Sequence, residues 1–166
     1  MLNSFRKLRA RKEDAARLYG AIVARAREPA FYARLGVADT IDGRFDLLAL
    51  HAWLVLDRLR EPGINDLSQA LTDTIFVGFE EGMRDLGTGD MGMGRKLKAF
   101  ADAFYGRLAA YHACEDEAAM TAAVVRNLYR GAENPNATAI ARYALAARER
   151  LAGQDVAAQL DFGPLP

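Results

Sequence analysis

A glycine-rich segment, GTGDMGMG at residues 87–94, is the part of the chain whose residue types and spacing are best suited to bind a ligand. Gly87, Gly89 and Gly92 match the pattern G-x-G-x-x-G, in which the backbone amides of a glycine loop bind the phosphates of a dinucleotide. That chemistry requires a strand before the loop and a helix after it. The element that precedes the segment therefore decides between a phosphate loop and a turn.

Apolar residues before this segment recur every three or four positions, which is typical of one face of a helix and not of an alternating strand. These residues are Leu67, Leu71, Ile75, Phe79, Met83 and Leu86. The segment is therefore predicted to join two helices, with Gly87 as a C-cap and Asp90 as an N-cap. A P-loop is disfavoured too, since Arg95 and Lys96 follow Gly94 where a Ser or Thr would have to hold magnesium. Binding of an anion or nucleotide at residues 87–94 stays an alternative.

Other residues that could support catalysis or bind a metal do not form a convincing set. Neither His51 nor His112 has the Glu three positions earlier that di-iron bundles use. His112 and Cys114 lie about 200° apart around a helix, so they cannot share one ion. Asp42 and Asp46 have a magnesium-binding spacing, but they fall at the start of a helix, where acids already suit the helix dipole. We expect no catalytic residue, no metal and no cofactor.

The composition bounds the class of protein. With 166 residues and 51% hydrophobic residues, the chain should fold as one domain with a substantial core. The formal net charge is zero, which gives nucleic-acid binding no support. One cysteine, no secretion signal and no apolar run of about 18 residues indicate a soluble protein of a reducing compartment.

The charges are unevenly distributed. Residues 1–12 hold five basic residues and no acid, whereas residues 66–90 hold six acids and only Arg84 as a base. We interpret residues 1–12 as a basic, mobile N-terminal segment and residues 13–166 as one helical domain. Phe5 and Leu8 lie between the basic residues, so contact with an anionic membrane surface is a further expectation and a peripheral membrane protein an alternative class.

The chain predicts an all-α fold, a single-domain bundle of about six or seven helices without a sheet. The segment LLALHAWLVL is apolar almost all round, which predicts a central, buried helix at residues 42–60, capped by Asp42. Within it we expect Trp53 in the core and His51 as a core histidine bonded to backbone. Further helices are expected at residues 12–27, from 65 or 66 to the glycine segment, from there to about 111, at 116–130 and at 137–152.

Two stretches resemble a known family. They are LHAW at residues 50–53 and FEEGMRDLGTGDMGMGRKLKAFADAFYGRLAAY at residues 79–111. With the run MRDLGTGD, the basic RKLK after it and the close FYGRLAAY, the chain resembles the ubiquinol–cytochrome c chaperone family, whose mitochondrial members assist assembly of the cytochrome bc1 complex. The resemblance implies a non-enzymatic, all-helical protein that holds newly made cytochrome b or another membrane-protein client of that complex.

The start of the chain lies close to the family core, so it is more similar to a bacterial relative than to mitochondrial members with a long leader. The expected location is the cytoplasm, peripheral at the inner face of the inner membrane, or the mitochondrial matrix if the source is eukaryotic. An exposed apolar or methionine-bearing patch rimmed by charge is the equipment such a chaperone needs. We hypothesise that the patch surrounds the glycine hinge, with a positive φ at Gly89. The partner-binding residues would be Arg84, Asp85, Gly89, Asp90, Met91, Arg95, Lys96 and Lys98.

Overall fold

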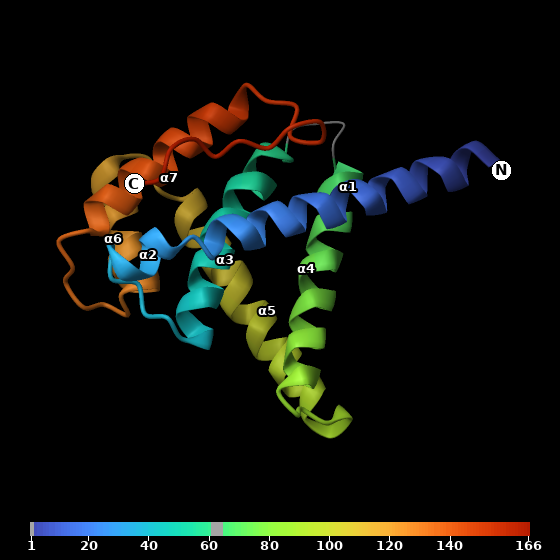
Figure 1. Cartoon of the computed structure of the whole chain (residues 1–166), viewed down its shortest axis with the longest axis horizontal. Helices are drawn as coiled ribbons and strands as arrows, with labels where there is room; N and C mark the ends of the chain where they lie inside the picture. Colours follow the sequence, from blue (N-terminus) through green and yellow to red (C-terminus); the bar gives the residue numbers. More distant parts are fainter. Residues whose placement is uncertain (1, 61–64) are drawn as a thin grey trace.

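The computed structural model describes the backbone of residues 2–60 and 65–166, and over these residues it contains seven helices and no strand (Figure 1). The predicted all-α fold is thereby confirmed. The helices are α1 (Leu2–Ala26), α2 (Pro29–Ala33), α3 (Ile41–Arg58), α4 (Asn65–Asp85), α5 (Asp90–His112), α6 (Glu117–Leu128) and α7 (Ala137–Ala152).

Helix α3 is the centre of the bundle, as its all-round apolar sequence predicts. It packs against α1, α5, α6 and α7, and almost every residue from Leu47 to Leu56 is buried. Asp42 was expected to cap this helix, but the N-cap is Thr40, whose hydroxyl accepts a hydrogen bond from the amide of Gly43 at 3.1 Å. Thr40 has the extended backbone that an N-cap needs, so Asp42 falls inside the first turn.

His51 is a buried core histidine, also as predicted. Its Nδ1 lies 2.8 Å from the carbonyl oxygen of Leu47, and its Nε2 lies 2.8 Å from the hydroxyl of Tyr143 on α7. Phe31 of α2 and Phe162 of the C-terminal tail pack edge-on against the imidazole. His51 therefore ties α3 to α2, α7 and the tail.

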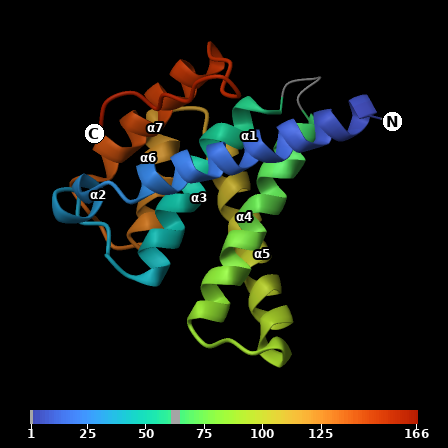
Figure 2. The same cartoon turned by 45° about the vertical axis from the view of Figure 1, so that its right-hand side comes forward.

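Helix α1 begins at Leu2, so the expected helix start at residue 12 was wrong. The basic segment is helical and is continuous with the part of α1 that packs on α3 and α4. The first turns of α1 project beyond the bundle in both views (Figures 1 and 2). Phe5 is 70% exposed there. Arg11 forms an ion pair with Asp66 at the start of α4.

The remaining helices form two hairpins. Helices α6 and α7 pack together on one side of α3, and the tail after α7 is fixed by Phe162 and by a hydrogen bond from Arg25 to the carbonyl oxygen of Gly163. Helix α4 packs on α1 and helix α5 on α3, and the ends of α4 and α5 that the glycine hinge joins project beyond the rest of the bundle (Figure 2). In the described part of the chain, no helix combines the length and hydropathy needed to cross a membrane.

Candidate functional site

The glycine hinge is a tight reversal between α4 and α5. Gly87 has φ +84°, its amide donates to the carbonyl of Arg84 at 2.8 Å, and the amide of Thr88 donates to the carbonyl of Met83 at 2.9 Å. A left-handed residue with two such bonds is the usual way to end a helix. The prediction of Gly87 as a C-cap is therefore confirmed.

The predictions for the next two residues were wrong. Gly89 has φ −78° and ψ 166°, an extended conformation open to any residue, and it occupies the N-cap position of α5. Asp90 lies in the first turn, and its carboxylate accepts a hydrogen bond from Arg84 at 2.8 Å. The carboxylate is drawn to a guanidinium across the hinge, so it does not bond the backbone amides of its own helix.

The charged residues of the hinge pair locally. Arg84 donates to Glu80 and to Asp90, both at 2.8 Å, and therefore bridges the two helices. Lys96 donates to the hydroxyl of Thr88 at 2.7 Å, and Lys98 pairs with Asp102 on its own helix. Lys96 and Lys98 therefore find their partners in Thr88 and Asp102 and not in the acidic row Asp66, Asp73 and Glu80 of α4.

All eight residues predicted to bind a partner are exposed at this end of the molecule. Met91 is 99% exposed, whereas Met93 is buried, as expected for the first residue of the core stripe of α5. The hinge brings the eight residues to one end of the α4–α5 hairpin, but their role as a binding surface stays a prediction.

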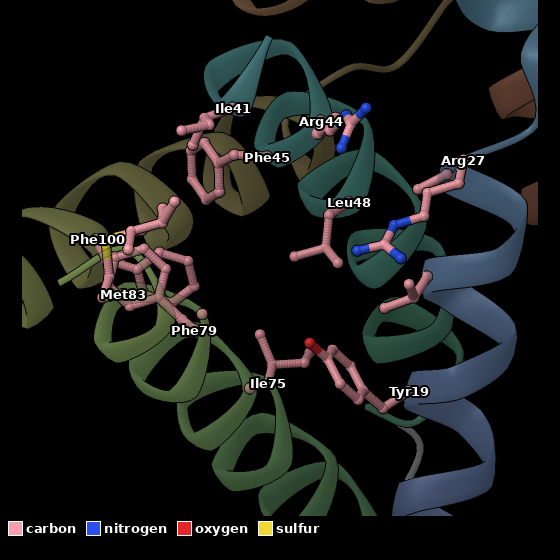
Figure 3. Close-up of a pocket in the computed structure, with 15 residues that line it drawn as sticks. Tyr19, Arg27, Ile41, Arg44, Phe45, Leu48, Ile75, Phe79, Met83 and Phe100 are labelled. Atoms are coloured by element: carbon pink, nitrogen blue, oxygen red, sulfur yellow. The ribbon is translucent and has the colours of Figure 1, made fainter. Parts of the chain in front are cut away.

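Next to the hinge the structure has an apolar cleft that the sequence did not predict. It has a volume of about 230 Å³ and is bounded by α1, α3, α4 and α5 (Figure 3). Its walls include Tyr19, Phe45, Leu48, Phe79, Met83 and Phe100. Phe79 stacks on Phe100 at 3.9 Å between ring centroids, which gives the cleft a firm aromatic side.

Two glycines of α4, Gly78 and Gly82, face the space between α1 and α4. A Cβ atom at Gly78 would lie 2.2 Å from the hydroxyl oxygen of Tyr19, so Gly78 makes room for that tyrosine. A Cβ atom at Gly82 would meet no atom within 4 Å, so Gly82 borders open space. The absence of a side chain at Gly82 therefore helps to keep the cleft open.

The rim of the cleft combines apolar and cationic groups. Ile41 and Leu86 are both 61% exposed at its edge. Arg44 pairs with Asp39 at 2.8 Å, whereas the guanidinium of Arg27 has no hydrogen-bond or ion-pair partner among the described residues. In Figure 3 the guanidinium of Arg27 reaches from α1 toward the opening.

The electrostatics of the cleft can be followed at Tyr19, whose hydroxyl points into it (Figure 3). Burial raises the pKa of Tyr19. The positive charge of Arg27 opposes this shift, and the negative charge of Glu81 adds a smaller contribution in the same direction as burial. Within residues 2–60 and 65–166, no group of three His, Cys, Asp or Glu side chains could hold a metal ion. The arrangement can bind an apolar surface that carries a negative charge.

Comparisons with known proteins agree with this architecture. Residues 33–164 match the family model described as ubiquinol–cytochrome C chaperone, a span that includes the hinge and the α3, α4 and α5 walls of the cleft. The fold is similar to the crystal structure of the Cbp3 homolog from Brucella abortus, with a TM-score of 0.86, 35% sequence identity and coverage of 99% of this chain and 97% of the other. A search of curated proteins found no significant match. Because the family model matches most of the chain, this protein belongs to the ubiquinol–cytochrome c chaperone family.

Proposed function

We propose that this protein is an assembly chaperone of the cytochrome bc1 complex that binds newly made cytochrome b before its partner subunits cover it. Family membership over residues 33–164 carries this proposal. The fold supports a binding role, because the cleft and the hinge offer apolar and charged surface for contact with another protein. We therefore propose a non-enzymatic function.

The client has a physical problem that such a protein solves. Cytochrome b exposes apolar helices and must acquire its haem groups before assembly covers them. A protein that binds the incomplete form more tightly than the assembled form holds the client and releases it as assembly proceeds. The exposed side chains of Ile41, Leu86 and Met91, beside the cleft and the hinge, supply apolar surface of this kind.

The decisive experiment removes the gene in the native host and measures assembled cytochrome bc1 complex and the haem content of cytochrome b. We expect both to fall, and both should recover when the wild-type protein is supplied again. Normal complex and normal haem content in the deletion strain would refute the proposed function.

The hinge residues are proposed to take part in client or partner binding. Asp90→Ala breaks an exposed ion pair with Arg84, which should leave the stability of the fold almost unchanged. A matched control is Glu117→Ala, which breaks an exposed pair with Arg142 between α6 and α7. If the hinge binds, Asp90→Ala stays folded and lowers the amount of assembled complex while Glu117→Ala does not. Equal complex levels in both variants would contradict a role for Asp90.

The projecting start of α1 favours an additional contact with the membrane that holds the client. Phe5 and Leu8 are exposed among basic residues on a helix, and such helices bind anionic bilayers in the plane of the interface. Co-sedimentation with phosphatidylglycerol vesicles should therefore decrease in a Phe5→Ser, Leu8→Ser variant. Equal binding of both proteins would remove the membrane contact from the proposal.

Anion or nucleotide binding at residues 87–94 is the competing class. Arg84 already engages two carboxylates, and Asp90 adds a negative charge in the first turn of α5, which disfavours an anion there. Titration with inorganic phosphate and with ATP tests this alternative. Saturable binding that requires Lys96 would favour it over the chaperone.

A further inference from the structure

We infer that the apolar cleft receives one α-helical segment of the client, through two apolar side chains one turn apart, and that Arg27 binds a carboxylate on the same segment. This inference rests on the proposed chaperone function and states what kind of segment the cleft selects. Its evidence is the shape, the walls and the charge of the cleft.

The volume limits what can enter. About 230 Å³ is roughly the space of eight water molecules, and it lies below the roughly 300–1,000 Å³ of pockets that enclose a cofactor or metabolite. The enclosed space therefore matches a few side chains better than a whole cofactor or metabolite. Its exposed apolar rim, Ile41 and Leu86, extends the contact surface beyond the space that is enclosed.

The walls require a helical occupant. The cleft is lined by residues of four helices, whose backbone amides and carbonyls are already bonded within those helices. An extended peptide pressed against such walls would bury backbone groups without partners, whereas a helix satisfies its own. Side chains spaced by three or four residues on one face of that helix can then enter together, as in helix-in-groove recognition.

The charge selects a carboxylate. In the part of the chain that the structure describes, the guanidinium of Arg27 has no ion-pair partner, while the charge of Arg44 is balanced by Asp39. Figure 3 shows Arg27 on the α1 side of the opening and Met83 on the α4 side. A client helix that places its apolar side chains over Phe79 and Met83 would therefore need an Asp or Glu toward α1 to reach Arg27.

The cleft can be filled without disturbing the fold. Gly82 is helical and a Cβ atom there meets nothing within 4 Å, so Gly82→Leu places a side chain in the open space and should not reduce thermal stability. Gly106→Leu is the matched control. Gly106 is an exposed glycine inside α5, also with open space around it, and it does not border the cleft.

The test uses the full chain and overlapping 18-residue synthetic peptides that together cover the cytochrome b of the host, with binding followed by fluorescence anisotropy. We expect bound peptides to share two apolar residues three or four apart and an Asp or Glu within two turns. Gly82→Leu should weaken this binding by at least about tenfold, the effect of losing roughly 1.4 kcal/mol of contact. Gly106→Leu should bind as the wild type does.

The carboxylate is tested by exchanging both partners. Arg27→Gln, or changing the acidic residue of the bound peptide to its amide, should each weaken binding by about tenfold, and the two changes together should weaken it little further. Independent effects of the two changes would overturn the pairing. Binding of laurate at micromolar concentration, with displacement of the peptide, would instead make the cleft a fatty-acid site and overturn the inference.

Failure of this inference differs from failure of the proposed function. If the deletion strain lacks the bc1 complex and Gly82→Leu restores it fully while binding every peptide as the wild type does, the cleft is not the client site and the chaperone function stands. If the deletion strain assembles normal complex, the chaperone function itself fails.

Discussion

Lowering the pH from 7 to 5 should destabilise this protein through His51. Its Nδ1 can bond the carbonyl of Leu47 only as a donor, so in the neutral ring Nε2 accepts the hydrogen bond from the hydroxyl of Tyr143. The same hydroxyl accepts a hydrogen bond from Arg25 at 2.9 Å. A second proton, on Nε2, would therefore point at the donating hydroxyl of Tyr143 and place a positive charge close to the guanidinium of Arg25.

The size of the effect follows from the pKa of His51. Burial, with a smaller contribution from the charge of Arg25, lowers the pKa of His51 from 6.5 to about 4, although the bond to Leu47 opposes the shift. The unfolded chain then binds a proton at higher pH than the folded chain does, so acid favours unfolding. This contribution to stability is fully present above pH 6.5 and is lost as the pH falls toward 4. Between pH 7 and 5 the loss amounts to about 2 kcal/mol.

The assay is urea unfolding at pH 7, 6 and 5, followed by the fluorescence of Trp53, the single tryptophan of the chain. The comparison protein is His51→Gln, which keeps a polar, neutral side chain that cannot titrate. Whatever the variant loses at pH 7, its stability should fall less on acidification, so its difference from the wild type should shrink by about 2 kcal/mol at pH 5. A difference that stays constant with pH would refute the assignment of this acid sensitivity to His51.

Three further predictions concern stability. Trp53→Ala should cost about 3–5 kcal/mol in urea unfolding, because the indole is only 2% exposed and packs on Tyr111; a cost near zero would place Trp53 outside the core. Gly87→Val should cost about 1–3 kcal/mol through its positive φ, whereas Gly89→Ala should cost little at φ −78°, and equal melting temperatures would contradict this account of the hinge. Arg107→Ala should cost about 3 kcal/mol, because it removes a partner 2.6 Å from the buried carboxylate of Asp46, and a loss within experimental error would show that Arg130 alone suffices.

The sequence predicted best where one local pattern determines the outcome. The all-round apolar run in α3 allows only a central position, and the glycine at the end of α4 allows only a C-cap. The N-caps of α3 and α5 were assigned wrongly for a physical reason. Asp42 and Asp90 are both suited to an N-cap, but Thr40 precedes the first, and Arg84 from the neighbouring helix binds the second. Competition between partners of one side chain depends on the fold, and a local pattern does not contain it.

The start of α1 shows the same limit. Residues 2–12 lack the apolar stripe of a buried helix, so the helix was placed only where the stripe begins. In the structure the helix extends from its packed part back to Leu2, and Arg11 gains a partner in Asp66 that only the packing of α1 on α4 brings near. Charge patterns along the chain therefore did not indicate which acids and bases meet.

The cleft was missed because its walls come from four helices that are far apart in the sequence. A local signal was nevertheless present in Gly78 and Gly82, two glycines one turn apart within a predicted helix. Glycine inside a helix costs about 1 kcal/mol relative to alanine, so each such residue calls for a reason in the folded protein. For Gly78 the reason is the hydroxyl of Tyr19, which occupies the place of a side chain.

For Gly82 no neighbouring atom gives a reason, and this difference connects the stability of the fold with its proposed function. A larger residue would fit at Gly82 and would favour the helix, so internal packing does not require glycine there. The space beside it is instead lined by apolar walls and bordered by the guanidinium of Arg27. A bundle optimised for stability alone would fill such a space, whereas a protein that must bind and release an apolar client needs it open. Gly82 is thus better explained by the client that the cleft is proposed to receive than by any contact of its own within the described residues.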